Sequence, residues 1–220
     1  MSVDLHLYAL VDPDRSGGHD LAGLSRSLAQ GGATLIQLRD KTGSTRRMIA
    51  QARAIKQALS GSSVPLLIND RVDVALAAGA DGVHIGWDDM PVGDARRLLG
   101  AEAIIGLSIK TREQVDAAPL DLLDYVCIGG VFKTMSKDNP EPPVGVSGFA
   151  QLASMVRARA PKMPVGAIAG IDENNAADVM TAGADGIAVI SALSLSRDPA
   201  QAAARLRAIV DRGLDLRGAA

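Results

Sequence analysis

The tetrapeptide Gly-Ala-Asp-Gly occurs twice in this chain, at residues 79–82 and 183–186. Each copy follows a stretch of small residues with helical periodicity and precedes a short apolar run. Each therefore indicates a helix that is capped by glycine and leads directly into a strand. Several similar units lie between and around the two copies. This repetition predicts an α/β fold, a (β/α)8 TIM barrel built from related units, better than a short open sheet.

Apolar runs and helical patterns alternate along the whole sequence. The expected parallel strands are 5–11, 34–38, 64–68, 82–85, 103–107, 125–128, 165–168 and 186–190. The expected helices are 21–30, 45–59, 72–78, 92–99, 112–118, 148–160, 173–182 and 199–212. No linker interrupts the alternation, so residues 1–220 are expected to form a single barrel domain. Functional residues are then expected just after the strands, where barrel enzymes place their active sites.

Length and charge restrict the partners. The 220 residues suffice for one well-filled core, and a formal net charge of −2 gives no reason to expect nucleic acid or an anionic membrane surface as a partner. Aromatic residues make up 2%, which disfavours stacking of bases on aromatic platforms. No apolar stretch approaches the roughly 20 residues of a membrane span, and no signal-like segment is present. We therefore expect small-molecule substrates, no nucleic acid and no membrane.

The only cysteine, Cys127, lies inside an apolar run and is expected to be a buried strand residue. A chain with no possible internal disulfide fits a reducing cytoplasm, which is the expected location. The sequence leaves the oligomeric state open, and a homo-oligomer is one of the alternatives.

Polar side chains follow the second expected strand. Alternation along the strand places Gln37, Arg39 and Lys41 on one side. A planar guanidinium and a compact ammonium beside an amide suit an anion with several oxygens, such as pyrophosphate. The alternative is a solvated strand end in which Arg39 or Lys41 pairs with Asp40.

Carboxylates follow the next two strands. Asn69 and Asp70 come after the third strand, and Asp88 and Asp89 come after the fourth. Because adjacent strand ends meet in a barrel, Asp70 and Asp89 could share Mg²⁺, which binds oxygen ligands and keeps several waters. Alternatively, each carboxylate caps the helix that follows it.

Hydroxyl groups and a further cation follow the fifth and sixth strands. Ser108 comes after the fifth strand, while Thr134, Ser136 and Lys137 lie in a long loop after the sixth. This combination suits phosphate, although each Ser or Thr taken singly is typical of caps and turns.

A second anion site is expected after the last two strands. Gly170 and Ser191 stand where backbone N–H groups and a helix start commonly bind phosphate in barrels, the alternative for Gly170 being a turn glycine. His84, inside the fourth strand, is expected to be structural. With only His6 and His19 besides it, no zinc spacing and no Ser-His-acid triad can be identified.

Taken in order, these segments resemble the thiamine phosphate synthase family over nearly the whole chain. The matching segments are 37–41, 69–71, 83–86 with Asp89, 106–108, 131–137 and 169–171. The resemblance implies a (β/α)8 barrel that joins hydroxymethylpyrimidine pyrophosphate to thiazole phosphate. The products would be thiamine phosphate and pyrophosphate, with Mg²⁺ assisting departure of the pyrophosphate.

The resemblance also implies a role for each matching residue. The pyrophosphate would be held by Arg39, Lys41, Asn69 and Lys137. The ligands of Mg²⁺ would be Asp70 and Asp89. The pyrimidine would be oriented by Gln37 and Ser108. The thiazole and its phosphate would be received by Thr134, Ser136, Gly170, Ile190 and Ser191. The residues acting most directly on the reaction would be Arg39, Lys41, Ser108 and Lys137.

Four positions depart from the usual family pattern. They are Trp87 in place of Gln, Lys110 in place of His, Lys133 in place of Pro and Ala169 in place of Gly. Each lies close to the expected site and bears on thiazole selectivity and turnover. Two alternative functions are a thiazole tautomerase on the same barrel and a non-catalytic phosphate-ligand sensor. The paired carboxylates and cations argue against the tautomerase, whereas binding without product would support the sensor.

Overall fold

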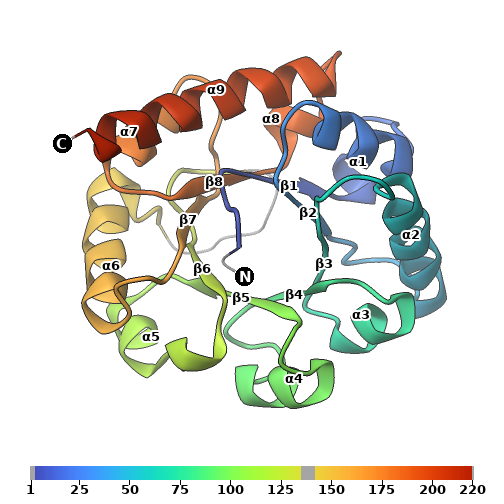
Figure 1. Cartoon of the computed structure of the whole chain (residues 1–220), viewed down its shortest axis with the longest axis horizontal. Helices are drawn as coiled ribbons and strands as arrows, with labels where there is room; N and C mark the ends of the chain where they lie inside the picture. Colours follow the sequence, from blue (N-terminus) through green and yellow to red (C-terminus); the bar gives the residue numbers. More distant parts are fainter. Residues whose placement is uncertain (1–2, 135–141, 220) are drawn as a thin grey trace.

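The computed structural model describes residues 3–134 and 142–219. In these residues eight parallel strands pair in sequence order, and β8 closes the barrel by pairing with β1 (Figure 1). The strands are β1 (Leu7–Val11), β2 (Leu35–Leu38), β3 (Leu66–Asn69), β4 (Gly82–Ile85), β5 (Ile104–Ile109), β6 (Tyr125–Ile128), β7 (Val165–Ile168) and β8 (Gly186–Val189). The predicted (β/α)8 TIM barrel is confirmed.

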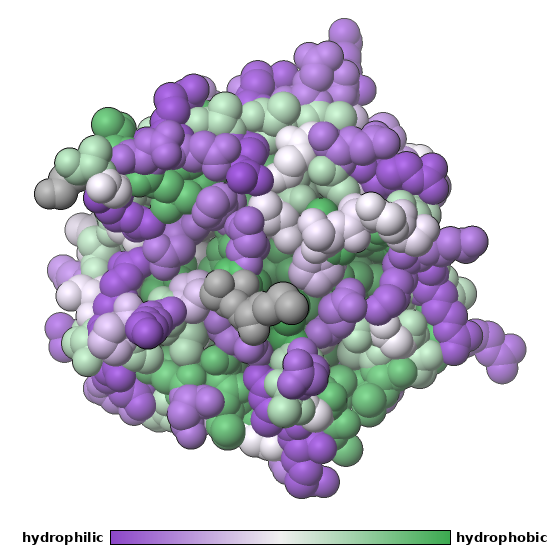
Figure 2. Space-filling view, in the orientation of Figure 1, coloured by the Kyte–Doolittle hydropathy of each residue, from purple (hydrophilic) through white to green (hydrophobic). Residues whose placement is uncertain are grey.

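Helices surround the barrel on its outside (Figure 1). They are α1 (Leu21–Gln30), α2 (Thr45–Ala58), α3 (Val72–Ala78), α4 (Val92–Leu99), α5 (Arg112–Ala117), α6 (Gly145–Arg159), α7 (Ala176–Thr181), α8 (Ser191–Ser194) and α9 (Pro199–Gly218). Short 3₁₀ turns lie at Pro13–Arg15 and Leu120–Leu122. Hydrophilic residues project from most of the molecular outline in Figure 2, as outer helix faces require. Among the described helices, none is long and apolar enough to cross a membrane.

Two apolar clusters fill the molecule. The larger one packs Val, Ile, Leu and Ala side chains of the strands against the helices. The smaller one lies inside the barrel and contains Tyr8, Leu35, Leu67, Tyr125 and Cys127. Burial of Cys127 is thereby confirmed, and it raises the pKa of the thiol to about 12. The thiol therefore stays protonated and unreactive near neutral pH.

The aspartates of the two Gly-Ala-Asp-Gly copies, Asp81 and Asp185, make hydrogen bonds at the amino-terminal ends of the strands. Thr34 and Asp124 make equivalent contacts. One polar residue stands immediately before each even-numbered strand, and its side chain accepts a hydrogen bond from a backbone N–H near the start of the preceding strand. The four acceptor and donor pairs are Thr34 with Leu7 at 3.1 Å, and Asp81 with Leu66, Asp124 with Ile105 and Asp185 with Val165 at 2.8 Å each. We call these four contacts the amino-terminal clamps.

Candidate active site

A cavity of about 520 Å³ lies at the carboxyl-terminal ends of the strands. This size is typical of a pocket for a small molecule. The predicted site residues that line it are Gln37, Arg39, Asn69, Ser108, Thr134, Gly170, Ile190 and Ser191. Residues predicted to follow six different strands thus meet at one place, as barrel topology requires.

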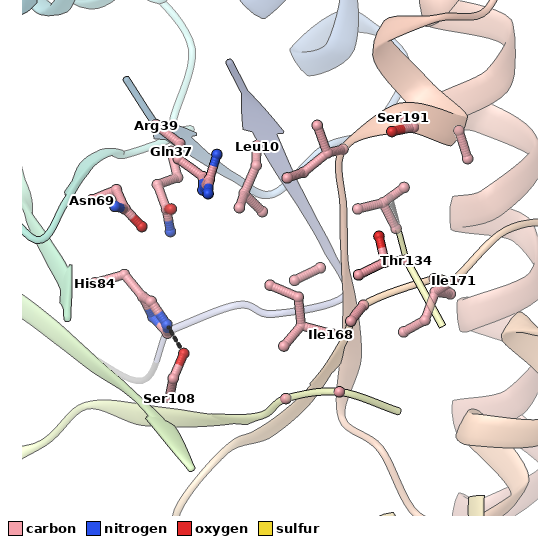
Figure 3. A pocket seen from close by; sticks show the side chains of 18 of the residues that line it. Leu10, Gln37, Arg39, Asn69, His84, Ser108, Thr134, Ile168, Ile171 and Ser191 are labelled. Carbon is pink, nitrogen blue, oxygen red and sulfur yellow. Dashed lines mark hydrogen bonds between the residues drawn. The ribbon is translucent and has the colours of Figure 1, made fainter. Parts of the chain in front are cut away.

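The cavity has two chemically different sides (Figure 3). On one side, Gln37, Arg39, Asn69, His84 and Ser108 present amide, guanidinium, imidazole and hydroxyl groups. The opposite side includes Ile168 and Ile171, with the hydroxyl groups of Thr134 and Ser191 nearby. Leu10, Lys110, Lys133 and Asp172 also line the cavity. A ligand with a heteroatom-rich part and a less polar part would match this division.

Arg39 is held by a carboxylate that the sequence analysis missed. Its guanidinium donates to Asp12, whose side chain is buried and also accepts the backbone N–H of Asp14 at 2.9 Å. The expected alternative, a pair between Arg39 and Asp40, does not form, because Asp40 accepts the N–H groups of Thr42 and Gly43 instead. Asp12 directly follows β1, so its place after a strand end was the available signal.

Asp70 lies between two of the predicted anion-binding residues. Lys41 donates to its carboxylate, and Asn69 Nδ2 donates to Asp70 Oδ2 at 2.6 Å. The backbone of Asp70 is left-handed, with φ of 59°. The capping alternative is wrong for this residue, since Arg71 occupies the N-cap of α3 and that cap has no side-chain hydrogen bond. The Asp70 carboxylate is instead turned towards Lys41.

Asp89 is the second predicted metal ligand. Its Oδ2 accepts the backbone N–H of Gly86 at 2.7 Å, while Pro91 occupies the N-cap of α4, so Asp89 does not cap that helix. Burial, and next the hydrogen bond and charge of the neighbouring Asp70, raise the pKa of the Asp89 carboxyl above its usual value. The two carboxylates repel each other when both are ionised. A cation bound beside them would therefore be stabilised.

The donor set fits a hard divalent cation. In the described ranges there is no cluster of three or more His, Cys, Asp or Glu side chains placed to hold a metal. Asp70 and Asp89 alone would leave most coordination positions to water and to ligand oxygens, which is how Mg²⁺ is usually bound. Lys41 and Arg39 bring positive charge to the same rim and would share in holding an anion.

His84 lies at the cavity rather than only in the core. Its Nε2 is 2.9 Å from Ser108 Oγ (Figure 3), and its Nδ1 is 2.9 Å from the hydroxyl of Tyr125. Tyr125 in turn lies 2.9 Å from the hydroxyl of Tyr8, which accepts from Gln37. Both tyrosines stand within apolar runs, so no local pattern indicates that they connect two predicted site residues.

The loop after β7 has an unusual backbone. Gly170 has φ of 67°, and a Cβ there would lie 2.5 Å from the carbonyl oxygen of Lys133, so only glycine fits. Gly170 is therefore a turn glycine that also lines the cavity. Ala169 has φ of 90°, although it carries a side chain. Ser191 begins the short helix α8 at the edge of the same cavity.

The remaining predicted positions divide into three groups. Ser136 and Lys137 lie outside the described residues. Lys110, Lys133 and Ala169, which depart from the family pattern, line the cavity. Trp87, the fourth departure, is 41% exposed in the loop between β4 and α4.

Comparison with known proteins gives a consistent result. A family model described as thiamine monophosphate synthase matches residues 7–193. The thiamine-phosphate synthase of Agrobacterium fabrum is 52% identical over 215 residues, which cover 98% of each chain. That of Albidiferax ferrireducens is 46% identical, with 94% of this chain and 92% of the relative covered. The structure of thiamine phosphate pyrophosphorylase from Pyrococcus furiosus superposes with a TM-score of 0.82 at 35% identity, covering 96% of this chain and 98% of that one.

Proposed function

This chain belongs to the thiamine monophosphate synthase family, and on that premise we propose that it couples hydroxymethylpyrimidine pyrophosphate to thiazole phosphate. The thiazole nitrogen forms a bond to the pyrimidine methylene carbon as that carbon loses pyrophosphate. The observation that carries the proposal is the meeting of two cations, Arg39 and Lys41, with two carboxylates, Asp70 and Asp89, beside one two-sided cavity.

Departure of the pyrophosphate is the step that the polar rim would assist. Arg39 offers a planar fork for two oxygens, and Lys41 and Asn69 add an ammonium and an amide donor. Asp12 holds the Arg39 guanidinium in place before the anion arrives. Mg²⁺ bound by Asp70 and Asp89 would neutralise charge on the leaving pyrophosphate. The aminopyrimidine can itself delocalise positive charge as the C–O bond breaks, so no protein nucleophile is needed.

Positioning of the two rings accounts for the rest of the site. Gln37 and Ser108 would orient the pyrimidine on the polar side, while the side formed by Ile168 and Ile171 would receive the thiazole. The thiazole phosphate would bind between Gly170 and Ser191. Holding two reactants in attacking geometry can by itself supply a large part of a rate enhancement.

Pyrophosphate release tests the proposal directly. Purified protein is given both substrates with Mg²⁺ or with EDTA, and thiamine phosphate is measured in the same samples. Coupled, magnesium-dependent appearance of both products is the expected outcome. Binding of either substrate without any product would instead favour the sensor, and rearrangement of a thiazole phosphate without need of Mg²⁺ would favour the tautomerase.

The metal assignment is tested by Asp89→Ala, with Asp88→Ala as the matched control on the adjacent residue. Loss of a carboxylate ligand is expected to lower magnesium-dependent turnover by about 100-fold or more, since metal stabilisation of a leaving group amounts to several kcal/mol. Circular dichroism should show the fold retained, and Asp88→Ala should behave as wild type. An unchanged rate and magnesium response in Asp89→Ala would remove Asp89 from the metal site.

Lys137 provides a second mutational test. Lys137→Ala is expected to raise KM for the pyrophosphate substrate, because one of the three cations proposed to hold the pyrophosphate, Arg39, Lys41 and Lys137, is lost. Kinetics equal to those of the wild-type protein would show that Lys137 does not bind the pyrophosphate of the substrate.

A further inference from the structure

Two buried carboxylates lie next to Arg39, behind the cavity wall. Asp12 directly follows β1, and Asp40 directly follows Arg39; their side chains are 3% and 0% exposed. Arg39 lines the cavity, whereas neither aspartate is among the described residues that line it. We call Asp12 and Asp40 the flanking carboxylates. Buried negative charge beside a pyrophosphate site opposes anion binding, so any benefit they bring to binding must come from geometry.

Asp12 fixes the Arg39 guanidinium from the neighbouring strand. Val11 and Leu38 are partners in the register of β1 and β2, and the backbone N–H of Arg39 donates to the carbonyl of Val11 at 2.9 Å. The pairing thus continues past the strand ends and brings Asp12 beside Arg39, whose Nη1 donates to Asp12 Oδ2. The guanidinium makes no other hydrogen bond within the described residues. Most of its five N–H donors are left for an anion.

Asp40 shapes the turn that carries Lys41. Its Oδ1 accepts the backbone N–H of Thr42 at 3.1 Å and that of Gly43 at 2.6 Å. A Cβ at Gly43 would collide with the Asp40 carboxylate, so glycine permits this close approach. An aspartate that accepts backbone N–H groups a few residues ahead stabilises a local turn. Lys41 lies within the turn, and its ammonium donates to Asp70.

A further contact joins the loops that follow β1 and β2. Asp12 Oδ1 accepts the N–H of Asp14 at 2.9 Å and caps the 3₁₀ turn Pro13–Arg15. Asp14 Oδ2 then accepts the hydroxyl of Thr42 at 3.2 Å. The two loops are therefore bonded to each other at both Arg39 and Thr42. A cation that is already held in one conformation loses less side-chain freedom when it binds an anion.

We propose that the flanking carboxylates are positioning residues that preorganise Arg39 and Lys41 for the pyrophosphate group. Asp12 acts through the guanidinium of Arg39, and Asp40 acts through the backbone of the turn. The inference rests on the proposed function for the identity of the anion. The geometric gain exceeds the repulsion by the two charges, so loss of the hydrogen bonds weakens anion binding, whereas loss of charge alone does not.

Two substitutions of Asp40 separate geometry from charge. Asp40→Asn and Asp40→Ala both remove the charge, but only alanine removes the oxygen that accepts the two N–H groups. The affinity for inorganic pyrophosphate with Mg²⁺ is measured by calorimetry. Asp40→Ala is expected to weaken binding by about 10-fold or more, while Asp40→Asn stays within about threefold of wild type. Equal affinities of the two variants would overturn the role of Asp40.

A charge control is available at the same rim. Asp88 is exposed and makes no hydrogen bond within the described residues, so Asp88→Asn removes one negative charge and no positioning contact. Its affinity for pyrophosphate is expected to equal that of the wild-type protein. Weakening as large as in Asp40→Ala would mean that the effect at position 40 is not one of positioning.

A double-mutant cycle tests Asp12. By charge alone Asp12→Asn would strengthen pyrophosphate binding, whereas loss of the fixed guanidinium is expected to weaken it by about 10-fold. In an Arg39→Ala background the same substitution should cause no further weakening, because the residue through which Asp12 acts is absent. Unchanged or tighter binding by Asp12→Asn alone, or equal weakening in both backgrounds, would overturn the role of Asp12.

The wild-type protein provides a measurement that does not depend on the folding of any variant at Asp12 or Asp40. With ¹⁵N-labelled arginine, and with Arg39 assigned by comparison with Arg39→Lys, the two Nη signals of Arg39 are expected to be separate before any anion is added. The bond from Nη1 to the buried Asp12 hinders the rotation that exchanges them. A single averaged signal would show that the guanidinium is not held in advance, which contradicts the proposal.

Turnover distinguishes this inference from the proposed function. Asp12→Asn should raise KM for the pyrimidine pyrophosphate and leave KM for thiazole phosphate unchanged; an equal rise in both would indicate general damage to the site and overturn the positioning role. The expected order of pyrophosphate affinities in a protein that couples no substrates would overturn the proposed function alone. Coupling by a wild-type protein whose pyrophosphate affinity is insensitive to both aspartates would overturn the positioning role alone.

Discussion

Ala169 carries backbone strain at the edge of the candidate site. Its φ of 90° is a conformation that L residues rarely adopt, and the family resemblance indicates glycine at this position. Ala169→Gly is expected to raise the free energy of unfolding by up to about 1 kcal/mol. This is the left-handed penalty of roughly 1–2 kcal/mol, reduced by the greater freedom of glycine in the unfolded chain. Urea unfolding measures the change.

A matched control for this substitution lies two residues earlier. Ala167 is fully buried in β7, so Ala167→Gly is expected to lower the free energy of unfolding, because glycine loses more freedom in a strand. If Ala169→Gly is destabilised by a similar amount, then the φ of Ala169 is not a source of strain.

Individual site residues differ in how far their sequence reveals them. Gln37, Asn69 and Ser108 are polar residues at the ends of apolar runs. The alternation of strands and helices predicted a barrel, and in a barrel these residues line one cavity. Tyr8 and Tyr125 could not be predicted, since parallel strands are buried on both faces and their apolar runs do not tell which side chains point inward. The hydrogen bond between these two tyrosines joins residues 117 positions apart, and no local pattern carries that information.

At the level of elements, the amino-terminal clamps connect strands in pairs. Besides its side-chain contact, each clamp residue donates its own backbone N–H to the carbonyl of the same partner residue. A basic side chain from a helix also contacts each of the three aspartates: Lys56 with Asp81, Arg96 with Asp124 and Arg157 with Asp185. Each of these clamps therefore links two adjacent strands and at least one outer helix, and Asp185 also pairs with Arg217 of α9. They lie at the amino-terminal face, where conserved contacts in barrels serve stability.

Asp124→Ala tests the role of a clamp. The side chain accepts the N–H of Ile105 and pairs with Arg96, so its removal leaves a part-buried donor without an acceptor. The expected loss is about 2 kcal/mol in the free energy of unfolding, with kcat unchanged because the cavity is at the opposite face. Asp121→Ala, at an exposed neighbouring position, is the control. A fall in kcat with unchanged stability would contradict the separation of the two faces.

Element boundaries show where local pattern is insufficient. The predicted limits of α1, α3 and α4 match the structure, and in each of the three helices the apolar periodicity ends at a glycine C-cap. Helix α7 begins at Ala176 rather than at residue 173, since Asp172 and Asn175 form a turn of their own. Helix α9 continues to Gly218 rather than ending at 212, because Arg217 bonds to Asp185 and to the carbonyl of Ala184. Tertiary contacts, which periodicity does not contain, set these ends.

At the scale of the whole molecule, closure of the barrel makes its parts interdependent. The last strand, β8, pairs with the first, β1, so no contiguous segment contains a complete set of strand partners. Unfolding is therefore expected to be cooperative, which would also support the prediction that residues 1–220 form one domain. The chain contains a convenient internal probe, because its sole cysteine, Cys127, is buried inside the barrel.

We expect pulse labelling of the Cys127 thiol and the far-UV circular dichroism of the helices to report the same urea midpoint. Labelling follows opening of the barrel interior, whereas dichroism follows mainly the outer helices, so coincidence means that both are lost together. Magnesium pyrophosphate should shift both midpoints upward equally, by about 2.7 kcal/mol of stability at 100 times its Kd, since a ligand of the folded state stabilises the whole cooperative unit. Cys127→Ala serves as the labelling blank. Thiol labelling that precedes the loss of helix would reveal an opened barrel with its helices intact, and the molecule would then not be a single cooperative unit.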